Sequence, residues 1–100
     1  MMLKIFLVED EIIVRQGVRD NMPWNQFGYK FVGEASDGEM ALSMIDQVRP
    51  DVLLTDIKMP FMDGLTLSKM VHQKYPDMKI IILSGYDDFE YAQEAINVGV

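Results

Sequence analysis

Short apolar runs alternate along the chain with longer segments in which apolar residues recur every three or four positions. The apolar runs predict four β-strands, at residues 3–8, 30–35, 51–56 and 79–85. The periodic segments predict four helices, at residues 11–22, 36–48, 64–75 and 87–99. Strands that alternate with helices of this length indicate βαβ units. The pattern therefore predicts one α/β domain built on a parallel sheet, with right-handed crossovers that place helices on both faces.

Local signals mark the starts of the predicted helices. Ser36 and Glu39 have the spacing of a capping box before the second helix, and Asp87 and Glu90 repeat it before the fourth. The Asp-Gly pair at residues 63–64 indicates a turn that begins the third helix. The apolar stripe expected on the first helix consists of Val14, Val18 and Met22, with Ile13 and Gly17 alongside. The apolar face expected on the second helix consists of Met40, Ala41, Met44, Ile45 and Val48.

Polar residues follow three of the predicted strands at the point where each strand ends. Glu9 and Asp10 come after the first strand. Asp56 ends the third strand, and Ser84 lies at the end of the fourth. In open parallel sheets the carboxyl ends of the strands share one rim, and ligands bind beyond it. We therefore expect these four side chains to converge.

The expected convergence of three carboxylates has a chemical consequence. Carboxylates a few ångströms apart cannot all stay ionised unless a cation is present or a pKa shifts. Mg²⁺ prefers oxygen ligands and is usually held by one or two carboxylates together with substrate phosphate oxygens. Beside such an ion Asp56 is a candidate nucleophile towards phosphorus, and Ser84 could donate a hydrogen bond to a phosphoryl oxygen. The rim thus predicts a Mg²⁺-dependent phosphoryl site.

Each of these residues also has a purely structural interpretation. An aspartate such as Asp56, placed between a strand and a loop, is often a turn former. The acidic residues 9–11 would also suit the positive end of the helix that follows them, and Ser84 would serve as an ordinary loop residue. The one histidine, His72, lies in a polar part of the third helix and is expected to be exposed. The coincidence of four such residues at successive strand ends favours the functional interpretation.

Composition narrows the classes of function. One hundred residues, 49% of them hydrophobic and 25% charged, suit one soluble globular domain. A net charge of −7 argues against direct binding to nucleic acid or to an anionic membrane. The absence of cysteine excludes disulfides, thiolate metal sites and cysteine catalysis. The apolar start is too short for a membrane span and is followed at once by acidic residues, which predicts a cytoplasmic protein.

Three segments carry a resemblance to a known family. "FLVEDE", "DVLLTDIKMPFMDG" and "IIILSGYDDFEYAQEAI" together resemble the receiver domain of bacterial two-component response regulators. The resemblance implies the CheY-like fold, a doubly wound parallel sheet of flavodoxin type with strand order 2-1-3-4. The stretch "RDNMPWNQFGYKFVGEASDGEMAL", with the ending "SGYDDFEYAQEAINVGV", further resembles receivers attached to AraC-type helix-turn-helix transcription factors. Such receivers take a phosphoryl group from a histidine kinase and act as signalling domains rather than turnover enzymes.

The resemblance also implies roles for particular residues. Asp56 would be the phosphoacceptor, Asp10 a direct ligand of Mg²⁺, and Glu9 a ligand acting through water. Lys58 would contribute its backbone carbonyl to the ion, and Ser84 would follow the phosphoryl group when the switch changes state. Glu9 departs from the aspartate that is commoner in the family, which should alter the geometry of the metal site without abolishing it.

The chain departs from the family more strongly at its end. Members of the family continue into a fifth strand, which carries a lysine that pairs with the phosphoryl group, and then into a fifth helix. We expect this chain to be a fragment whose parent protein continues into a DNA-binding domain. Residues 79–83 would then form an uncovered sheet edge, which predicts self-association or marginal stability.

Two other functions fit part of the pattern. Enzymes of the haloacid dehalogenase type also place an aspartate nucleophile beside Mg²⁺ at a strand end. They carry a second aspartate two residues later, where this chain has Lys58, so a turnover phosphatase is disfavoured. A receiver-like interaction module that never takes phosphate is the other alternative, and it stays open because the lysine of the fifth strand is missing.

Overall fold

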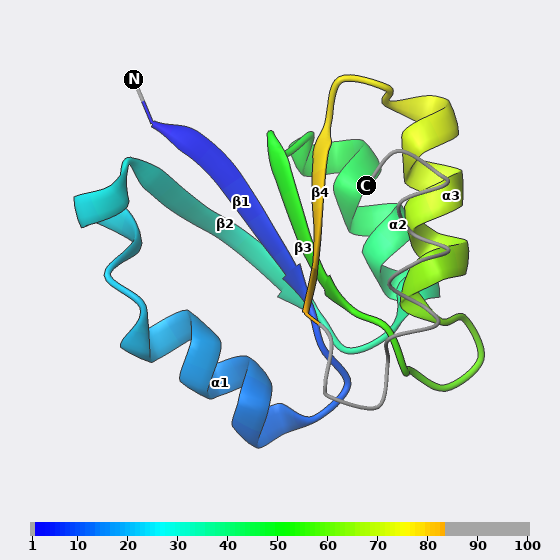
Figure 1. Cartoon of the computed structure of the whole chain (residues 1–100), viewed down its shortest axis with the longest axis horizontal. Coiled ribbons are helices and arrows are strands. Elements are labelled where there is room, and N and C mark those ends of the chain that lie inside the picture. Colours follow the sequence, from blue (N-terminus) through cyan, green and yellow to red (C-terminus); the bar gives the residue numbers. More distant parts are fainter. Residues whose placement is uncertain (1, 84–100) are drawn as a thin grey trace.

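The computed structural model describes residues 2–83 (Figure 1). Its strands are β1 (Leu3–Val8), β2 (Tyr29–Ala35), β3 (Val52–Asp56) and β4 (Lys79–Leu83). Its helices are α1 (Ile12–Asn21), α2 (Gly38–Val48) and α3 (Gly64–Lys74), with a short 3-10 helix, η1 (Trp24–Phe27), before β2. The elements predicted in this range are confirmed, and the helix predicted at residues 87–99 lies outside it. Among the described residues, the helices lack the length and apolar character needed to cross a membrane.

The strands form one parallel sheet in the order β2-β1-β3-β4, which confirms the predicted fold class and strand order. Near the carboxyl ends, Val8 pairs with Ala35 on one side and with Thr55 on the other. On the far side of β3, Asp56 pairs with Leu83. The strands therefore finish at nearly the same level, and the residues that follow β1 and β3 reach the same rim (Figure 1).

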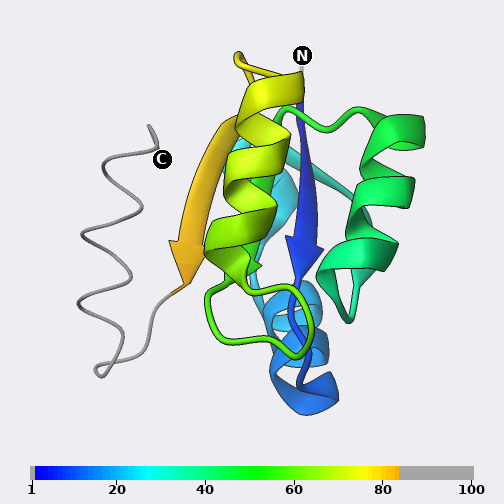
Figure 2. The ribbon, with the colours of Figure 1, turned by 90° about the vertical axis from the view of Figure 1, so that its right-hand side faces the viewer.

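The helices cover the two faces of the sheet unequally. Helices α2 and α3 lie side by side on one face, and α1 lies on the other (Figures 1 and 2). The larger buried cluster, on the α2 and α3 face, includes Phe6, Val8, Ala41, Ile45, Leu53, Leu67 and Val71. The smaller cluster consists of Ile5, Leu7, Val52 and Leu54. Successive residues of β1 and β3 belong to opposite clusters, as the two-residue period of a strand requires.

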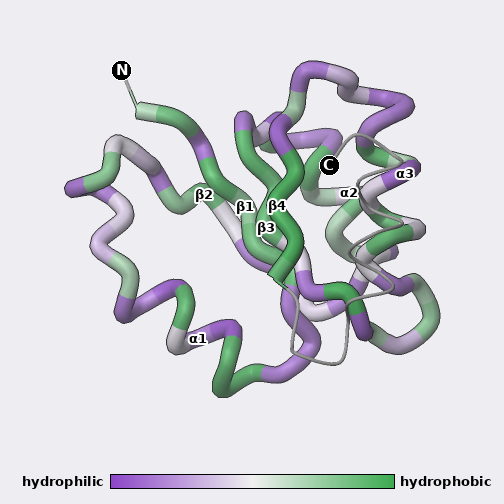
Figure 3. Tube along the Cα trace, viewed as in Figure 1, coloured by the Kyte–Doolittle hydropathy of each residue, from purple (hydrophilic) through white to green (hydrophobic). Residues whose placement is uncertain are grey.

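Helix α1 differs most from the expected packing. No residue of α1 is buried by the residues that the structure describes, and Ile13 and Val14 are 80% and 41% exposed. Of the predicted stripe, Val18 packs against the smaller cluster, whereas Met22 lies beyond the last helical residue. Apolar and polar positions alternate along the helix (Figure 3). The predicted stripe was therefore only partly correct, and two other residues of α1, Arg15 and Arg19, form ion pairs with Glu34 of β2.

The start of α2 corrects a local prediction. Asp37, rather than Ser36, is the N-cap, and its Oδ1 accepts a hydrogen bond from the backbone N–H of Met40 at 2.8 Å. Met40 is 49% exposed, so its expected place in the apolar face was wrong. The buried residues of α2 are Gly38, Ala41 and Ile45. Their spacing of three and four positions follows one face of a helix, and Met40 lies about 100° around the axis from Ala41.

Candidate functional site

Three carboxylates meet at the carboxyl rim of the sheet. Glu9, Asp10 and Asp56 each contribute one carboxylate oxygen to a group whose members lie within 4.8 Å of one another. This convergence is the one expected from the strand ends. Carboxylate oxygens gathered in this way form a group that could hold a metal ion.

Backbone contacts fix these residues to the sheet. The N–H of Glu9 donates to the carbonyl of Ala35 at 3.1 Å, which extends the pairing of β1 with β2 by one residue. Asp56 is the last residue of β3, and its Oδ1 accepts a hydrogen bond from the N–H of Ile57 at 2.8 Å. The rim carboxylates therefore stand on the ends of rigid strands rather than on long loops.

Glu9 occupies an unusual environment for a carboxylate. It is only 4% exposed, and burial raises its pKa from 4.5 to about 7. A hydrogen bond from the N–H of Glu11, at 3.1 Å, lowers the pKa, whereas the neighbouring Asp56 and Asp10 carboxylates raise it further. The raised pKa means that ionisation of Glu9 is disfavoured in this environment. A bound cation would instead favour the ionised form.

The loop after Asp56 is held tightly against the end of β3. Asp63 caps α3 by accepting a hydrogen bond from the N–H of Thr66 at 2.8 Å, which confirms the predicted start of that helix. The N–H of Gly64 donates to the carbonyl of Ile57 at 2.6 Å. A Cβ on Gly64 would lie 1.9 Å from the backbone oxygen of Asp56. Glycine is therefore required there, because the helix begins directly against the backbone of Asp56.

Other predicted residues stand apart from this cluster or outside the described range. Lys58 follows Asp56 by two positions and is exposed, and the role of its backbone carbonyl stays a prediction. Ser84 lies outside the described residues, and its role stays a prediction. His72 is half-buried on α3 rather than exposed as expected.

Two residues at the rim were missed by the sequence analysis. Arg15 of α1 donates from Nη1 to the backbone carbonyl of Glu9 at 2.8 Å. Its Nε lies 3.3 Å from Oε2 of Glu34, on β2. A pattern of charges along the sequence would be the signal for this ion pair. Arg15 and Glu34 give no such pattern, because they lie 19 positions apart on different elements.

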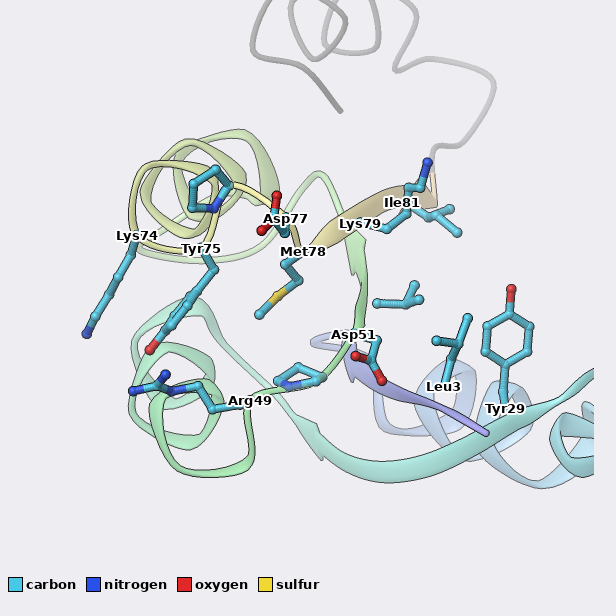
Figure 4. A pocket seen from close by; sticks show the side chains of 13 residues that line it. Leu3, Tyr29, Arg49, Asp51, Lys74, Tyr75, Asp77, Met78, Lys79 and Ile81 are labelled. Atoms are coloured by element: carbon cyan, nitrogen blue, oxygen red, sulfur yellow. The ribbon is translucent and has the colours of Figure 1, made fainter. Parts of the chain in front are cut away.

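A groove of about 760 Å³ lies at the opposite, amino-terminal end of the strands (Figure 4). Its lining includes Leu3, Tyr29, Arg49, Asp51, Tyr75 and Ile81. Two carboxylates at this end have cationic or N–H partners: Asp51 accepts from the N–H of Lys4 at 2.7 Å, and Asp46 accepts from Nζ of Lys74 at 2.8 Å. The acidic cluster and the groove thus belong to opposite ends of the sheet.

The fold and the acidic rim together define a class of protein. The chain belongs to the response regulator receiver domain family, whose model matches residues 5–100. The family resemblance found in the sequence is therefore confirmed. Receiver domains are signalling domains that bind Mg²⁺ at an acidic pocket, and this chain has an acidic cluster of Glu9, Asp10 and Asp56 at its carboxyl rim.

Individual relatives are regulators of transcription. The chain is 41% identical over 99 residues to the uncharacterized transcriptional regulatory protein YesN of Bacillus subtilis, covering 99% of this chain and 27% of that protein. It is 39% identical over 95 residues to the transcriptional regulatory protein HptR of Staphylococcus aureus, covering 95% of this chain and 37% of HptR. The chain thus spans about a quarter to a third of the length of these relatives.

Solved structures show the same fold. The receiver domain of AraT, a response regulator from Geobacillus stearothermophilus, is 47% identical and superposes with a TM-score of 0.92, over 100% of this chain and 78% of that one. A two-component transcriptional regulator AraC from Clostridium phytofermentans is 39% identical with a TM-score of 0.83, over 89% of this chain and 72% of that one.

Proposed function

We propose that this chain is a phosphoacceptor switch module in which Asp56 accepts a phosphoryl group. The observation that carries the proposal is the meeting of Glu9, Asp10 and Asp56 within 4.8 Å at the rim where β1 and β3 end. Membership of the receiver family supports this function over a turnover phosphatase. The position two residues after Asp56 is Lys58, which has no carboxylate to act as the general acid of such an enzyme.

Mg²⁺ is the cofactor that the donor set suits best. Asp10 and Asp56 would bind the ion directly, Glu9 would act through water, and Lys58 would offer its backbone carbonyl. An all-oxygen set of this kind suits a hard divalent cation. When bound, the ion would neutralise charge on the rim and on the incoming phosphoryl group. The raised pKa of Glu9 supports this assignment, because burial and the neighbouring Asp56 and Asp10 carboxylates disfavour its charged form, which a bound cation would favour.

The chemistry assigned to the residues of this chain is a single transfer. A carboxylate oxygen of Asp56 forms a bond to phosphorus as the bond between phosphorus and a donor histidine nitrogen breaks, and the electron pair of that bond stays on the imidazole. The N–H of Ile57, bonded to Oδ1, keeps the carboxylate oriented. Ser84 would donate a hydrogen bond to a phosphoryl oxygen after the transfer.

The partners follow from the same proposal. The phosphodonor would be a sensor histidine kinase, and the responding partner a DNA-binding output domain in a longer parent protein. The relatives named as transcriptional regulators are roughly three times the length of this chain, which supports that domain organisation. This domain itself would make no direct contact with nucleic acid or membrane, because its net charge is −7.

Self-association through β4 is a further part of the proposal. Within the described residues β4 pairs only with β3, and Ile81 is 43% exposed. An unpaired strand edge can pair with the edge of another chain. Sedimentation should therefore show a mass that rises with concentration, and a monomer at every concentration would contradict this part.

Intact mass spectrometry tests the acceptor assignment. The chain is incubated with Mg²⁺ and acetyl phosphate beside Asp56→Asn, with Asp77→Asn as a matched control, since Asp77 is an exposed aspartate at the other end of the sheet. We expect a Mg²⁺-dependent phosphoryl adduct on the wild type and on Asp77→Asn, and none on Asp56→Asn. Circular dichroism confirms that all three are folded. Equal uptake by Asp56→Asn would refute the acceptor, and no uptake by folded wild type would favour the non-phosphorylated interaction module.

A further inference from the structure

A chain of contacts connects the acidic rim to α1 and β2. Arg15 donates from Nη1 to the carbonyl oxygen of Glu9 at 2.8 Å, and its Nε faces Oε2 of Glu34 at 3.3 Å. The side chains of Arg15 and Glu34 are only 16% and 24% exposed. The guanidinium of Arg15 is therefore held by two groups, the carboxylate of Glu34 on β2 and the backbone carbonyl of Glu9 at the proposed metal site.

The atom that Arg15 contacts matters for the geometry of the rim. The carbonyl oxygen of Glu9 lies in the same planar peptide unit as the backbone nitrogen of Asp10. A hydrogen bond to this oxygen therefore restricts rotation of the peptide from which both carboxylates project. We infer that Arg15 is a positioning residue for the metal ligands Glu9 and Asp10, and that Glu34 anchors Arg15; this inference rests on the proposed function.

The geometry distinguishes this role from that of a simple counter-charge. The guanidinium of Arg15 contacts a neutral carbonyl and Glu34, rather than a carboxylate of the rim. Oε2 of Glu34 is shielded from solvent and accepts no hydrogen bond among the described residues, so the ion pair with Arg15 is its main compensation. A counter-charge would compete with Mg²⁺, and its removal would tighten metal binding. Removal of a positioning residue weakens metal binding.

The chain offers a matched control in Arg19. Its Nη1 also pairs with Glu34, one turn further along α1, and it makes a second ion pair with Asp20. Within the part of the chain that the structure describes, these ion pairs of Arg19 do not involve Glu9. Arg19→Met therefore removes a comparable ion pair with the same carboxylate and leaves the hydrogen bond to the Glu9 carbonyl in place.

The decisive measurement is the Mg²⁺ dissociation constant by calorimetry for wild type, Arg15→Met, Arg15→Lys, Glu34→Gln and Arg19→Met. Loss of a residue that orients metal ligands weakens binding by about 10–100-fold. We expect about a tenfold weakening in Arg15→Met, smaller losses in Arg15→Lys and Glu34→Gln, and little change in Arg19→Met. Tighter binding in Arg15→Met would identify a counter-charge. An equal loss in Arg19→Met would identify a general effect on α1, and either result would overturn the inference.

A metal-free measurement separates this inference from the proposed function. Amide hydrogen exchange at Glu9 and Glu11 reports the order of the rim, since the N–H of Glu9 bonds to Ala35 and that of Glu11 to the Glu9 carboxylate. We expect faster exchange at both amides in Arg15→Met and Arg15→Lys, but not in Arg19→Met. Unchanged exchange in folded Arg15 variants would overturn the positioning role. A wild type that binds no Mg²⁺ would count against the metal assignment, while the exchange rates would still decide the role of Arg15.

Discussion

The two ends of the sheet treat carboxylates in opposite ways. At the amino-terminal end, hydrogen bonds from Lys74 and then from Tyr75 hold the pKa of Asp46 below its usual 3.8. At the carboxyl end, burial and then the Asp56 carboxylate raise the pKa of Glu9 to about 7. Asp46 is therefore paired with side chains at the end of α3, whereas Glu9 is buried beside other carboxylates.

The two ends therefore hold two kinds of carboxylate: one that links two helices through an ion pair, and three that cluster at the proposed metal site. Asp46 lies on α2 and its partners lie at the end of α3, so the pair joins two neighbouring helices. The rim carboxylates instead lie close to one another, beyond the ends of β1 and β3. Substitutions of carboxylates at the two ends should therefore have different signatures.

The largest effect should come from Gly64→Ala, which disrupts only the carboxyl end. The added Cβ would lie 1.9 Å from the backbone oxygen of Asp56, and backbone cannot give way as a flexible side chain can. We expect a loss of about 3 kcal/mol or more in the free energy of unfolding, measured by urea denaturation. Gly17→Ala in α1 is the control, because its Cβ would meet only Asn21 at 3.8 Å. A loss in Gly17→Ala as large as in Gly64→Ala would contradict the steric explanation.

Asp10→Ala should weaken metal binding at the carboxyl end with little change in the fold. Removing one charge-assisted interaction from the site should cost about 1.5–3 kcal/mol, which corresponds to about a 10- to 150-fold weaker Mg²⁺ affinity. Phosphoryl uptake should fall with it. Mg²⁺ titration and intact mass measure the two effects, and Asp77→Ala, at the other end of the sheet, should alter neither. Unchanged affinity in Asp10→Ala would remove Asp10 from the metal site.

Without metal, the pH dependence of the free energy of unfolding should show that the charged form of Glu9 is disfavoured in the folded state. The unfolded chain loses this proton near pH 4.5 and the folded chain near 7, so the folded state binds more protons in between and stability falls as pH rises through that window. Glu9→Gln should lack this fall and become the more stable of the two above pH 7. Thermal unfolding in a chelator between pH 4 and 8 measures the difference. Parallel profiles for the two proteins would contradict the raised pKa.

The smallest effect should come from Asp46→Asn at the amino-terminal end. The folded pKa of Asp46 is lowered, so its contribution is present above the unfolded value of 3.8 and is lost as pH falls through the folded value. We expect only a slight loss of stability at neutral pH, because exposed ion pairs contribute little. The loss should disappear in acid, which is the reverse of the trend for Glu9. Asp77→Asn is the control in the same denaturation series. A large loss in Asp46→Asn would mean that this end is not merely a surface pairing.

Much of the fold followed from local patterns. Periodicity placed the four strands and three helices close to their observed ends, and the alternation of elements fixed the parallel sheet. The cap of α2 was assigned one residue early, because Ser36 and Asp37 are both good caps and the extended backbone of Asp37 decides between them. The exposure of α1 could not be foreseen, since its apolar stripe looks the same whether or not a sheet covers it.

The candidate site was predictable only in part, for a related reason. Glu9, Asp10 and Asp56 were found because parallel strands end at one rim, which is a rule of topology. Arg15 and Glu34 were missed because their contact depends on how α1 packs across β2, which no spacing reveals. The need for glycine at residue 64 was likewise invisible, since the sequence shows a turn but not its distance from Asp56.

The pairing of β1 with β3 also has a consequence for how the site assembles during folding. Glu9 and Asp10 follow β1, whereas Asp56 ends β3, and contacts between the starts of these strands, such as that of Lys4 with Asp51, join residues 47 positions apart. Such non-local pairings are entropically costly and slow folding. A chain that has formed only its β1–α1–β2 unit possesses two of the carboxylates and no complete site. Under the proposed function, the site for phosphoryl transfer would therefore be complete only after β1 and β3 have paired.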